Sequence, residues 1–225
     1  MKKMKHSLLL FLLLCIAATA SAQRVELNEE GRDAAYVKTI CERSQKIVNK
    51  LALTDGDVAL NVRNIIANRY FLLNDIYEKR DAAVKEAKEK LTGDAKNAAV
   101  QAAENAKDSE LFRHHFELES GLSLFLDDTQ IEAVKDGMTY GVVKVTYDAQ
   151  CDMIPTLKDY EKKQILAWLK EAREYAMDAE NSNKKHAAFG KYKGRINNYL
   201  SKQGYDLTKE REAWYERVKA RGGKL

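Results

Sequence analysis

The chain has 225 residues, of which 45% are hydrophobic and 32% are charged, and its formal net charge is +4. This length is sufficient for one sizeable core, and the near balance of charge argues against nucleic-acid binding as the main role. One proline and many helix-forming residues predict a mainly α protein.

The N-terminus has the pattern of a secretory signal peptide. Three lysines precede a short apolar run, and small residues follow it as far as Ala22. We therefore expect residues 1–22 to be removed and residues 23–225 to act in the periplasm or outside the cell. Neither the apolar run nor any later segment is long enough to cross a bilayer, so we expect no membrane span in the mature chain.

The expected mature chain is unevenly charged. Removal of residues 1–22 takes away three lysines and no carboxylate, which lowers the formal charge from +4 to +1. From Lys184 to the end there are 12 Lys and Arg against 4 Asp and Glu, whereas the preceding mature part has 23 against 30. We favour docking of this basic part, about 184–225, on the acidic body, with binding of an anionic partner as the alternative.

The first half of the mature chain is predicted to contain a long helical hairpin. Apolar residues recur every three or four positions, which is the spacing of one helix face. Between 82 and 106 alanine replaces nearly all larger apolar residues, so this part should bury little area and project from the body. The expected elements are helices over about 37–51 and 55–90, a turn at 92–94, and a helix to about 125, with the antiparallel hairpin over about 55–125.

The second half is predicted to be helical as well. The stretch from Gly141 to Ile154 has strand-like composition but keeps a helical apolar spacing, and we favour helix. Pro155 ends it, an amphipathic helix follows, and two further helices precede and follow Gly204, the last one capped by Thr208. The prediction is one domain of five to seven helices.

Helix starts are marked by a recurring leucine followed by a capping residue, at 53–57, at 126–130 and, degraded, at 157–161. Similar starts occur in small helical periplasmic proteins that include a chaperone. A chaperone-like role is therefore one functional hypothesis.

No familiar catalytic or metal-binding motif is present, and we expect no metal or cofactor. His114 and His115 are adjacent and point to different helix faces. We expect His115 in the core and His114 in a solvated charge cluster with acidic neighbours. Cys41 and Cys151 remain after export, either as a disulfide or as small buried side chains.

The basic helix contains two glycines, Gly190 and Gly194, each of which costs about 1 kcal/mol relative to alanine in a helix interior. We favour close packing of another helix against this small-residue face. The alternative is binding of an acidic glycan at the neighbouring cations, with an aromatic side chain stacking on a sugar ring. The candidate binding residues are Lys191, Lys193, Arg195 and Tyr192, joined by His186 and Asp178 if the protein is a lyase or hydrolase.

Three stretches, Val134–Tyr140, Glu171–Asp178 and Phe189–Leu200, resemble an uncharacterised family of secreted Bacteroidota proteins catalogued as a domain of unknown function. Genes for its members are often near genes for complex-polysaccharide breakdown. The chain departs from the family at Lys158 and at 180–181. The resemblance implies a glycan-linked setting but supplies no site residues. We therefore expect a non-enzymatic exported protein that binds an acidic oligosaccharide or a partner protein, with a polysaccharide lyase or hydrolase as the alternative.

Overall fold

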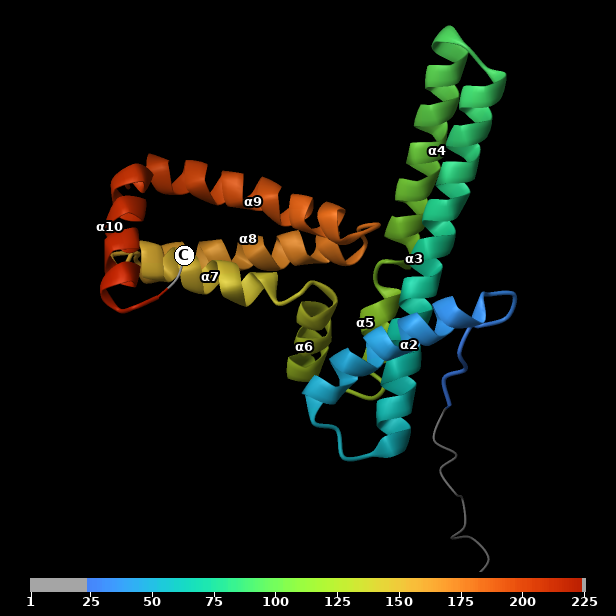
Figure 1. The fold of residues 1–225 in the computed structure, drawn as a ribbon, viewed down its shortest axis with the longest axis horizontal. Coiled ribbons are helices and arrows are strands. Elements are labelled where there is room, and N and C mark those ends of the chain that lie inside the picture. The colour runs from blue at the N-terminus through green and yellow to red at the C-terminus, as the bar shows by residue number, and fades with distance from the viewer. Residues whose placement is uncertain (1–23, 224–225) are drawn as a thin grey trace, which may run out of the picture.

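The structure is a computed structural model that describes residues 24–223 (Figure 1). The expected signal peptide, residues 1–22, lies outside this range. The described residues are mainly α-helical, as predicted, and contain more helices than the five to seven expected. The elements are α2 (Ala34–Val48), the 3-10 helix η1 (Asn49–Leu51), α3 (Gly56–Lys90), α4 (Gly93–His114), α5 (Glu117–Leu122), α6 (Asp128–Met138), α7 (Val142–Met153), α8 (Asp159–Met177), α9 (Ser182–Lys202) and α10 (Leu207–Ala220).

Helices α3 and α4 lie side by side, and their joined ends project beyond the rest of the molecule (Figure 1). We call this projecting part, residues 81–104, the arm. No residue of α4 is buried, because its alanine side chains cover little area. The single helix expected to continue to about 125 is in fact broken: α4 ends at His114 and α5 begins at Glu117.

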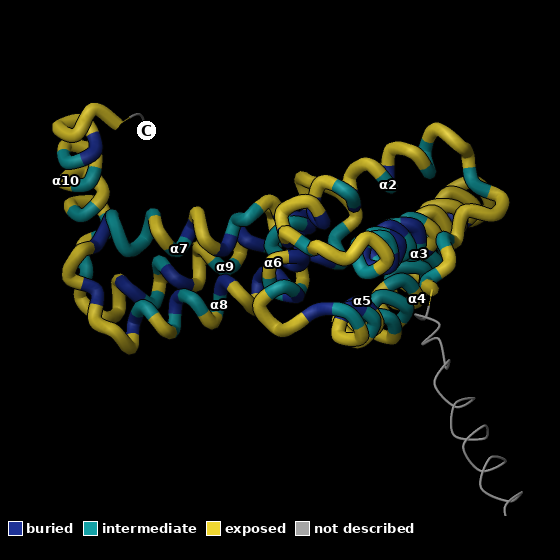
Figure 2. The backbone as a smooth tube through the Cα atoms, turned by 90° about the horizontal axis from the view of Figure 1, so that it is seen from below, coloured by how far each residue is buried: buried dark blue, intermediate teal, exposed yellow. Residues whose placement is uncertain are grey.

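Two large hydrophobic clusters form the core, and dark segments in Figure 2 trace them along the helices. The first joins α2, η1, α3, α5 and α6, and Met177 of α8 reaches into it. The second joins α7, α8 and α9, with partly buried side chains of α10 against it. Helix α8 therefore connects the two halves of the molecule.

Charged side chains also hold α6 against α8. Arg173, only 2% exposed, donates from Nη1 to Asp136 Oδ1 at 2.7 Å and from Nη2 to Glu132 Oε1 at 2.5 Å. Lys135 Nζ of α6 lies 3.2 Å from Glu174 Oε1 of α8 and 2.8 Å from Glu119 Oε2 of α5. Because a buried ion must keep its partner, this network fixes the position of α8 relative to α6.

The helix after Gly141 and the start of α6 agree with the sequence predictions, whereas the cap of α10 differs. The stretch after Gly141 is the helix α7, as favoured. Asp127 caps α6 and forms the expected capping box with Gln130. Helix α10 is capped by Asp206 rather than by Thr208, because the Asp206 carboxylate accepts from the first free backbone amides.

Cys41 and Cys151 are not bonded to each other. Cys41 packs with Ile40 and Phe71, whereas Cys151 packs with the second hydrophobic cluster. The disulfide alternative is therefore wrong, because the two thiols lie in separate parts of the core. No helix among residues 24–223 is both long and apolar enough to cross a membrane.

The expected close approach at Gly190 and Gly194 is also wrong. A Cβ atom added at either glycine would meet no heavy atom within 4 Å, and both residues are exposed. The buried face of α9 is the apolar one, which includes Phe189 and Ile196. The glycines therefore lie on the solvent side, where no neighbouring helix explains them.

The basic C-terminal part docks on the acidic body at a few points. Arg195 pairs with Glu171, and Arg221 pairs with Asp152. Among the described residues, Lys191 and Lys193 have no carboxylate within 4 Å. Part of the positive charge of α9 is thus left facing solvent.

Candidate functional site

The break between α4 and α5 is held by a buried arginine of α3. Arg69, 5% exposed, donates from Nη1 to the backbone oxygen of His114 at 2.8 Å, and its Nη2 pairs with the Asp178 carboxylate. The oxygen of His114 belongs to the last turn of α4, where carbonyls lack partners within the helix. Arg69 thus replaces the missing helical hydrogen bond and connects the break to the end of α8.

The break places the next residue, His115, against the same carboxylate. His115 Nδ1 lies 2.6 Å from Asp178 Oδ2, and Nε2 lies 3.7 Å from Glu174 Oε2. The hydrogen bond to Asp178 raises the pKa of His115 above its ordinary value, although partial burial acts in the opposite direction. His115 is therefore a cleft residue held by an ion pair, and the expectation that it belongs to the core is wrong.

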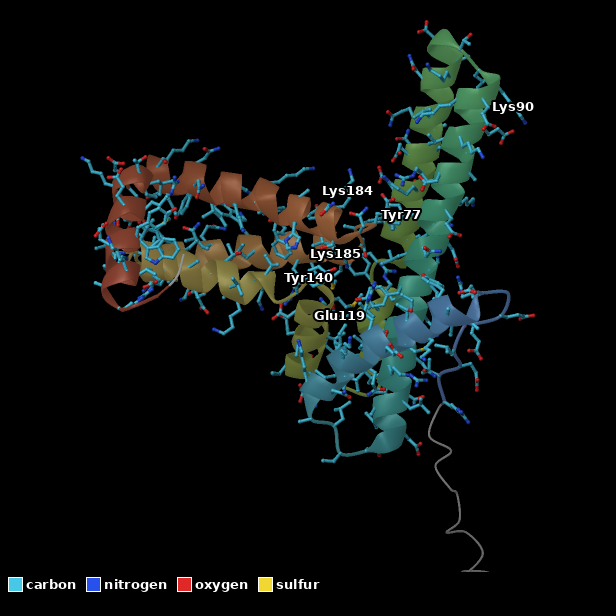
Figure 3. All side chains as sticks on the ribbon, in the orientation of Figure 1. Tyr77, Lys90, Glu119, Tyr140, Lys184 and Lys185 are labelled. Atoms are coloured by element: carbon cyan, nitrogen blue, oxygen red, sulfur yellow. The ribbon has the colours of Figure 1, made fainter. Side chains whose placement is uncertain are left out.

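Asp178 is fixed from a further direction. The hydroxyl of Tyr77 donates to the backbone oxygen of Asp178 at 2.8 Å, and burial raises the pKa of Tyr77 to about 12. Figure 3 labels Tyr77 on α3, beside the turn between α8 and α9. The carboxylate, its backbone and the histidine are thus positioned by α3, α4 and α8 together.

These groups line a cleft of about 590 Å³ between the base of α4 and α8, which we call the aromatic cleft. Three large aromatic side chains around it face solvent: Phe112 is 74% exposed, Phe116 64% and Tyr175 64%. Exposed aromatic groups gathered around one hollow are typical of a binding surface.

The lining also contains carboxylates, and cations pair with them. Glu171 lies 3.4 Å from Arg195, and Glu174 lies 3.2 Å from Lys135. Such fixed carboxylate oxygens are ready acceptors for hydroxyl or amine donors.

The structure brings together some of the residues predicted as a site. Tyr192 lies beside Tyr175, with ring centroids 6.3 Å apart, and Arg195 stands over the ring of Trp168 at 4.5 Å. Because Tyr175 and Glu171 line the aromatic cleft, Tyr192 and Arg195 lie at its rim, and Asp178 lies in its lining.

The remaining predicted residues are elsewhere. Lys191 and Lys193 are exposed on α9. His186 stacks on Tyr140, with centroids 5.7 Å apart and an interplanar angle of 15°, and Tyr140 lines a different cleft. A single enzyme site built from Asp178, His186, Arg195 and Tyr192 is therefore not assembled.

His114 forms the charge cluster that the sequence predicted, with contacts of 3.5 Å to Glu110 and 2.8 Å to Glu117. In the part of the chain from 24 to 223, no group of three or more His, Cys, Asp or Glu side chains is arranged to hold a metal ion.

Sequence reasoning missed Arg69, Phe112 and Phe116. The aromatic pair carried a usable signal, because two phenylalanines four residues apart share one helix face and follow a stretch almost without large apolar residues. Arg69 carried no such signal, since its partners are far away in the sequence.

Comparison with known proteins gives a family but no activity. A family model described as "Protein of unknown function (DUF3826)" matches residues 37–220. A comparison with curated protein sequences finds no match.

Proposed function

The chain belongs to this family, and we propose on that premise that it is an exported accessory protein that binds glycans in complex-polysaccharide utilisation and does not act as an enzyme. The observation that carries the proposal is the aromatic cleft, where three exposed rings surround oriented carboxylates. The C–H faces of sugar rings suit aromatic faces, while sugar hydroxyls donate to carboxylates. Export is inferred from the N-terminal sequence pattern, and the polysaccharide setting from the family resemblance.

An acidic fragment is the form of ligand that the rim favours. Arg195 is held over Trp168, so its guanidinium is presented at the edge of the cleft rather than free to move. Lys191 and Lys193 lie exposed on the same helix. A glycan that leaves the cleft along α9 would place a uronate or sulfate close to these cations.

The test is binding of oligosaccharides to the mature protein, measured by calorimetry. The double variant Phe112→Ser, Tyr175→Ser should bind at least about tenfold more weakly, because it removes two stacking surfaces. Tyr215→Ser is the matched control, since Tyr215 is an exposed aromatic residue on α10, away from the cleft. Equal affinity of the double variant and the control would refute the proposed site.

A second experiment addresses the charge of the ligand. Reversal of charge at Lys191, Lys193 and Arg195 should weaken binding of uronate oligosaccharides more than binding of neutral ones of equal length. If both classes weaken equally, or neither does, an acidic glycan is not the ligand of this rim.

One observation favours catalysis as a second candidate function. His115 is oriented through Nδ1 by Asp178, which leaves Nε2 as a group for proton transfer in the cleft. A polysaccharide lyase or hydrolase would use it as the acid or base. New reducing ends or unsaturated sugars that form with the wild type, and are lost in His115→Gln, would show this activity. Binding without any product supports the non-enzymatic role.

The aromatic cleft would also suit docking of a partner protein. If the Phe112→Ser, Tyr175→Ser variant no longer pulls down a partner but still binds glycans, the cleft is a protein-docking site. A chaperone-like role has less support. Apart from the three rings at the aromatic cleft, the exposed large apolar side chains among residues 24–223 are spread over several elements.

A further inference from the structure

A second cleft, of about 490 Å³, lies between α2 and the start of α9, and Ala179 lines both clefts. We call it the cationic cleft, because four positive side chains line it: Arg43, Lys46, Lys50 and Lys185. None of these four has a carboxylate within 4 Å among the described residues. The carboxylate in the lining, Glu180, is engaged by Arg80 at 3.1 Å.

Lys185 is the most informative of these cations, because it is only 6% exposed. Its ammonium donates one hydrogen bond, to the backbone oxygen of Met138 at 3.1 Å, and the nearby ring of Tyr70 is 5.8 Å away. An ammonium carries three donors, and burying it without a counter-ion is unfavourable. The buried ammonium of Lys185 therefore has no negative partner, and a bound ligand could supply one.

The surroundings reinforce this need for an anion. The pKa of Lys185 is lowered to about 8, mainly by burial; Asp178 acts in the opposite direction, and the charges of Arg43 and Arg69 contribute to the lowering. Lys185 also lies in the first turn of α9, whose N-terminus carries the positive end of the helix dipole. Figure 3 shows Lys184, Lys185 and Tyr140 close together at this end of α9.

The backbone at the margin of the cleft is unusual as well. Tyr140 has a φ of +62°, a left-handed conformation that is uncommon for a bulky residue. Such conformations persist where surrounding contacts fix them, and they gather at binding sites. Here the conformation lets the Tyr140 ring stack on His186 while lining the cleft.

We propose that the cationic cleft binds a small organic oxyanion, a carboxylate, sulfate or phosphate carried on a sugar-sized molecule. Lys185 and Arg43 are the anion ligands, from α9 and α2 respectively. The tyrosines of the lining, Tyr36 and Tyr70, provide the apolar walls for the rest of the molecule. The cleft uses none of the side chains on which the proposed glycan binding depends.

The test is calorimetry on the mature protein in a low-salt, phosphate-free buffer. The probes are galacturonate with galactose, and glucose 6-phosphate with glucose, together with inorganic phosphate and sulfate. We expect one-to-one binding of at least one anion, without binding of its neutral counterpart. The anion that binds best identifies the source of the charged group as a uronate, a phosphate or a sulfate.

Two variants assign the binding to this cleft. Lys185→Met and Arg43→Gln should each weaken anion binding by about tenfold or more, because each removes a charged hydrogen-bond donor. Arg43 is exposed, so its variant should fold even if the buried site tolerates change poorly. Lys219→Gln is the matched control and should leave the affinity unchanged, because Lys219 is exposed on α10 and lines neither cleft.

No binding of any probe anion would overturn the proposal, and so would binding that both variants leave intact. The Phe112→Ser, Tyr175→Ser variant separates this site from the aromatic cleft. It should keep its affinity for the anion while losing affinity for the glycan. If it loses the anion instead, the anion belongs to the aromatic cleft and the assignment is wrong.

Discussion

Replacing Lys185 with methionine is expected to stabilise the unliganded protein, although it removes a hydrogen bond. The pKa of Lys185 is about 8 in the fold against an ordinary value of 10.5, which corresponds to a cost of about 3 kcal/mol for keeping the ammonium charged. Losing the hydrogen bond to the oxygen of Met138 costs about 1 kcal/mol. The net gain in the free energy of unfolding is therefore about 2 kcal/mol, or a rise in Tm of about 4–8 °C.

The sign of the pH dependence follows from a folded-state pKa that is lower than the unfolded one. Below pH 8 the ammonium is charged in both states, and the destabilisation is complete; it disappears as the pH rises towards 10.5. The charged and titratable groups that act on Lys185 or line its cleft are Arg43, Arg69, Asp178, Glu180, Lys46, Lys50, Tyr36, Tyr70 and Tyr140. Because these groups are the same in wild type and variant, the difference between the two proteins isolates the lysine.

The assay is urea unfolding at pH 7 and at pH 10, in a buffer without phosphate or sulfate. Lys184→Met is the control, because Lys184 is exposed beside Lys185 and should change stability by no more than about 0.5 kcal/mol. A Lys185→Met variant less stable than wild type at pH 7 would refute the reasoning, since it would show that the fold itself stabilises the charged amine.

Three further predictions concern single positions. Gly194→Ala should raise the free energy of unfolding by about 1 kcal/mol without affecting ligand binding, because the added methyl group meets nothing within 4 Å; thermal unfolding measures it. Gly137→Ala should instead lower it by about 1–3 kcal/mol, because the new Cβ would lie 2.8 Å from Cγ2 of Ile47, and the same unfolding assay should show the opposite sign. His115 has a raised folded-state pKa, so its pairing with Asp178 stabilises the fold fully below about pH 6.5, and this contribution is lost as the pH rises through the folded value. Urea unfolding of wild type and His115→Gln across pH 5.5 to 8 should show a difference that shrinks with rising pH, and a constant difference would contradict the assigned pair.

Local signals in the sequence were sufficient for much of the fold. The helix after Gly141 was predicted because its apolar spacing outweighs strand-like composition once both neighbours are helical. The start of α6 was predicted because the groups that cap it, Asp127 and Gln130, are three residues apart. Interactions of this kind lie within one turn of chain and are readable without tertiary structure.

The site depended on contacts that no local pattern reveals. The break after α4 occurs without proline or glycine, because Arg69 takes up the oxygen of His114 and His115 turns to Asp178, 63 residues away. The prediction that a helix packs against the glycines of α9 was wrong for a related reason. Sequence spacing defines the faces of a helix, but which face meets a neighbour depends on where the rest of the chain lies.

The arm has a consequence for how the molecule opens. A helix with no buried residue gains little from its partner, so the tip of the arm is held mainly by hydrogen bonds within each helix. Local unfolding can then start at the turn near Gly93 and proceed along the arm towards the body, while both hydrophobic clusters stay packed. Amide hydrogens should therefore exchange fastest at the tip and progressively more slowly towards Arg69, which makes that residue the point where the loose part of the protein meets its rigid part.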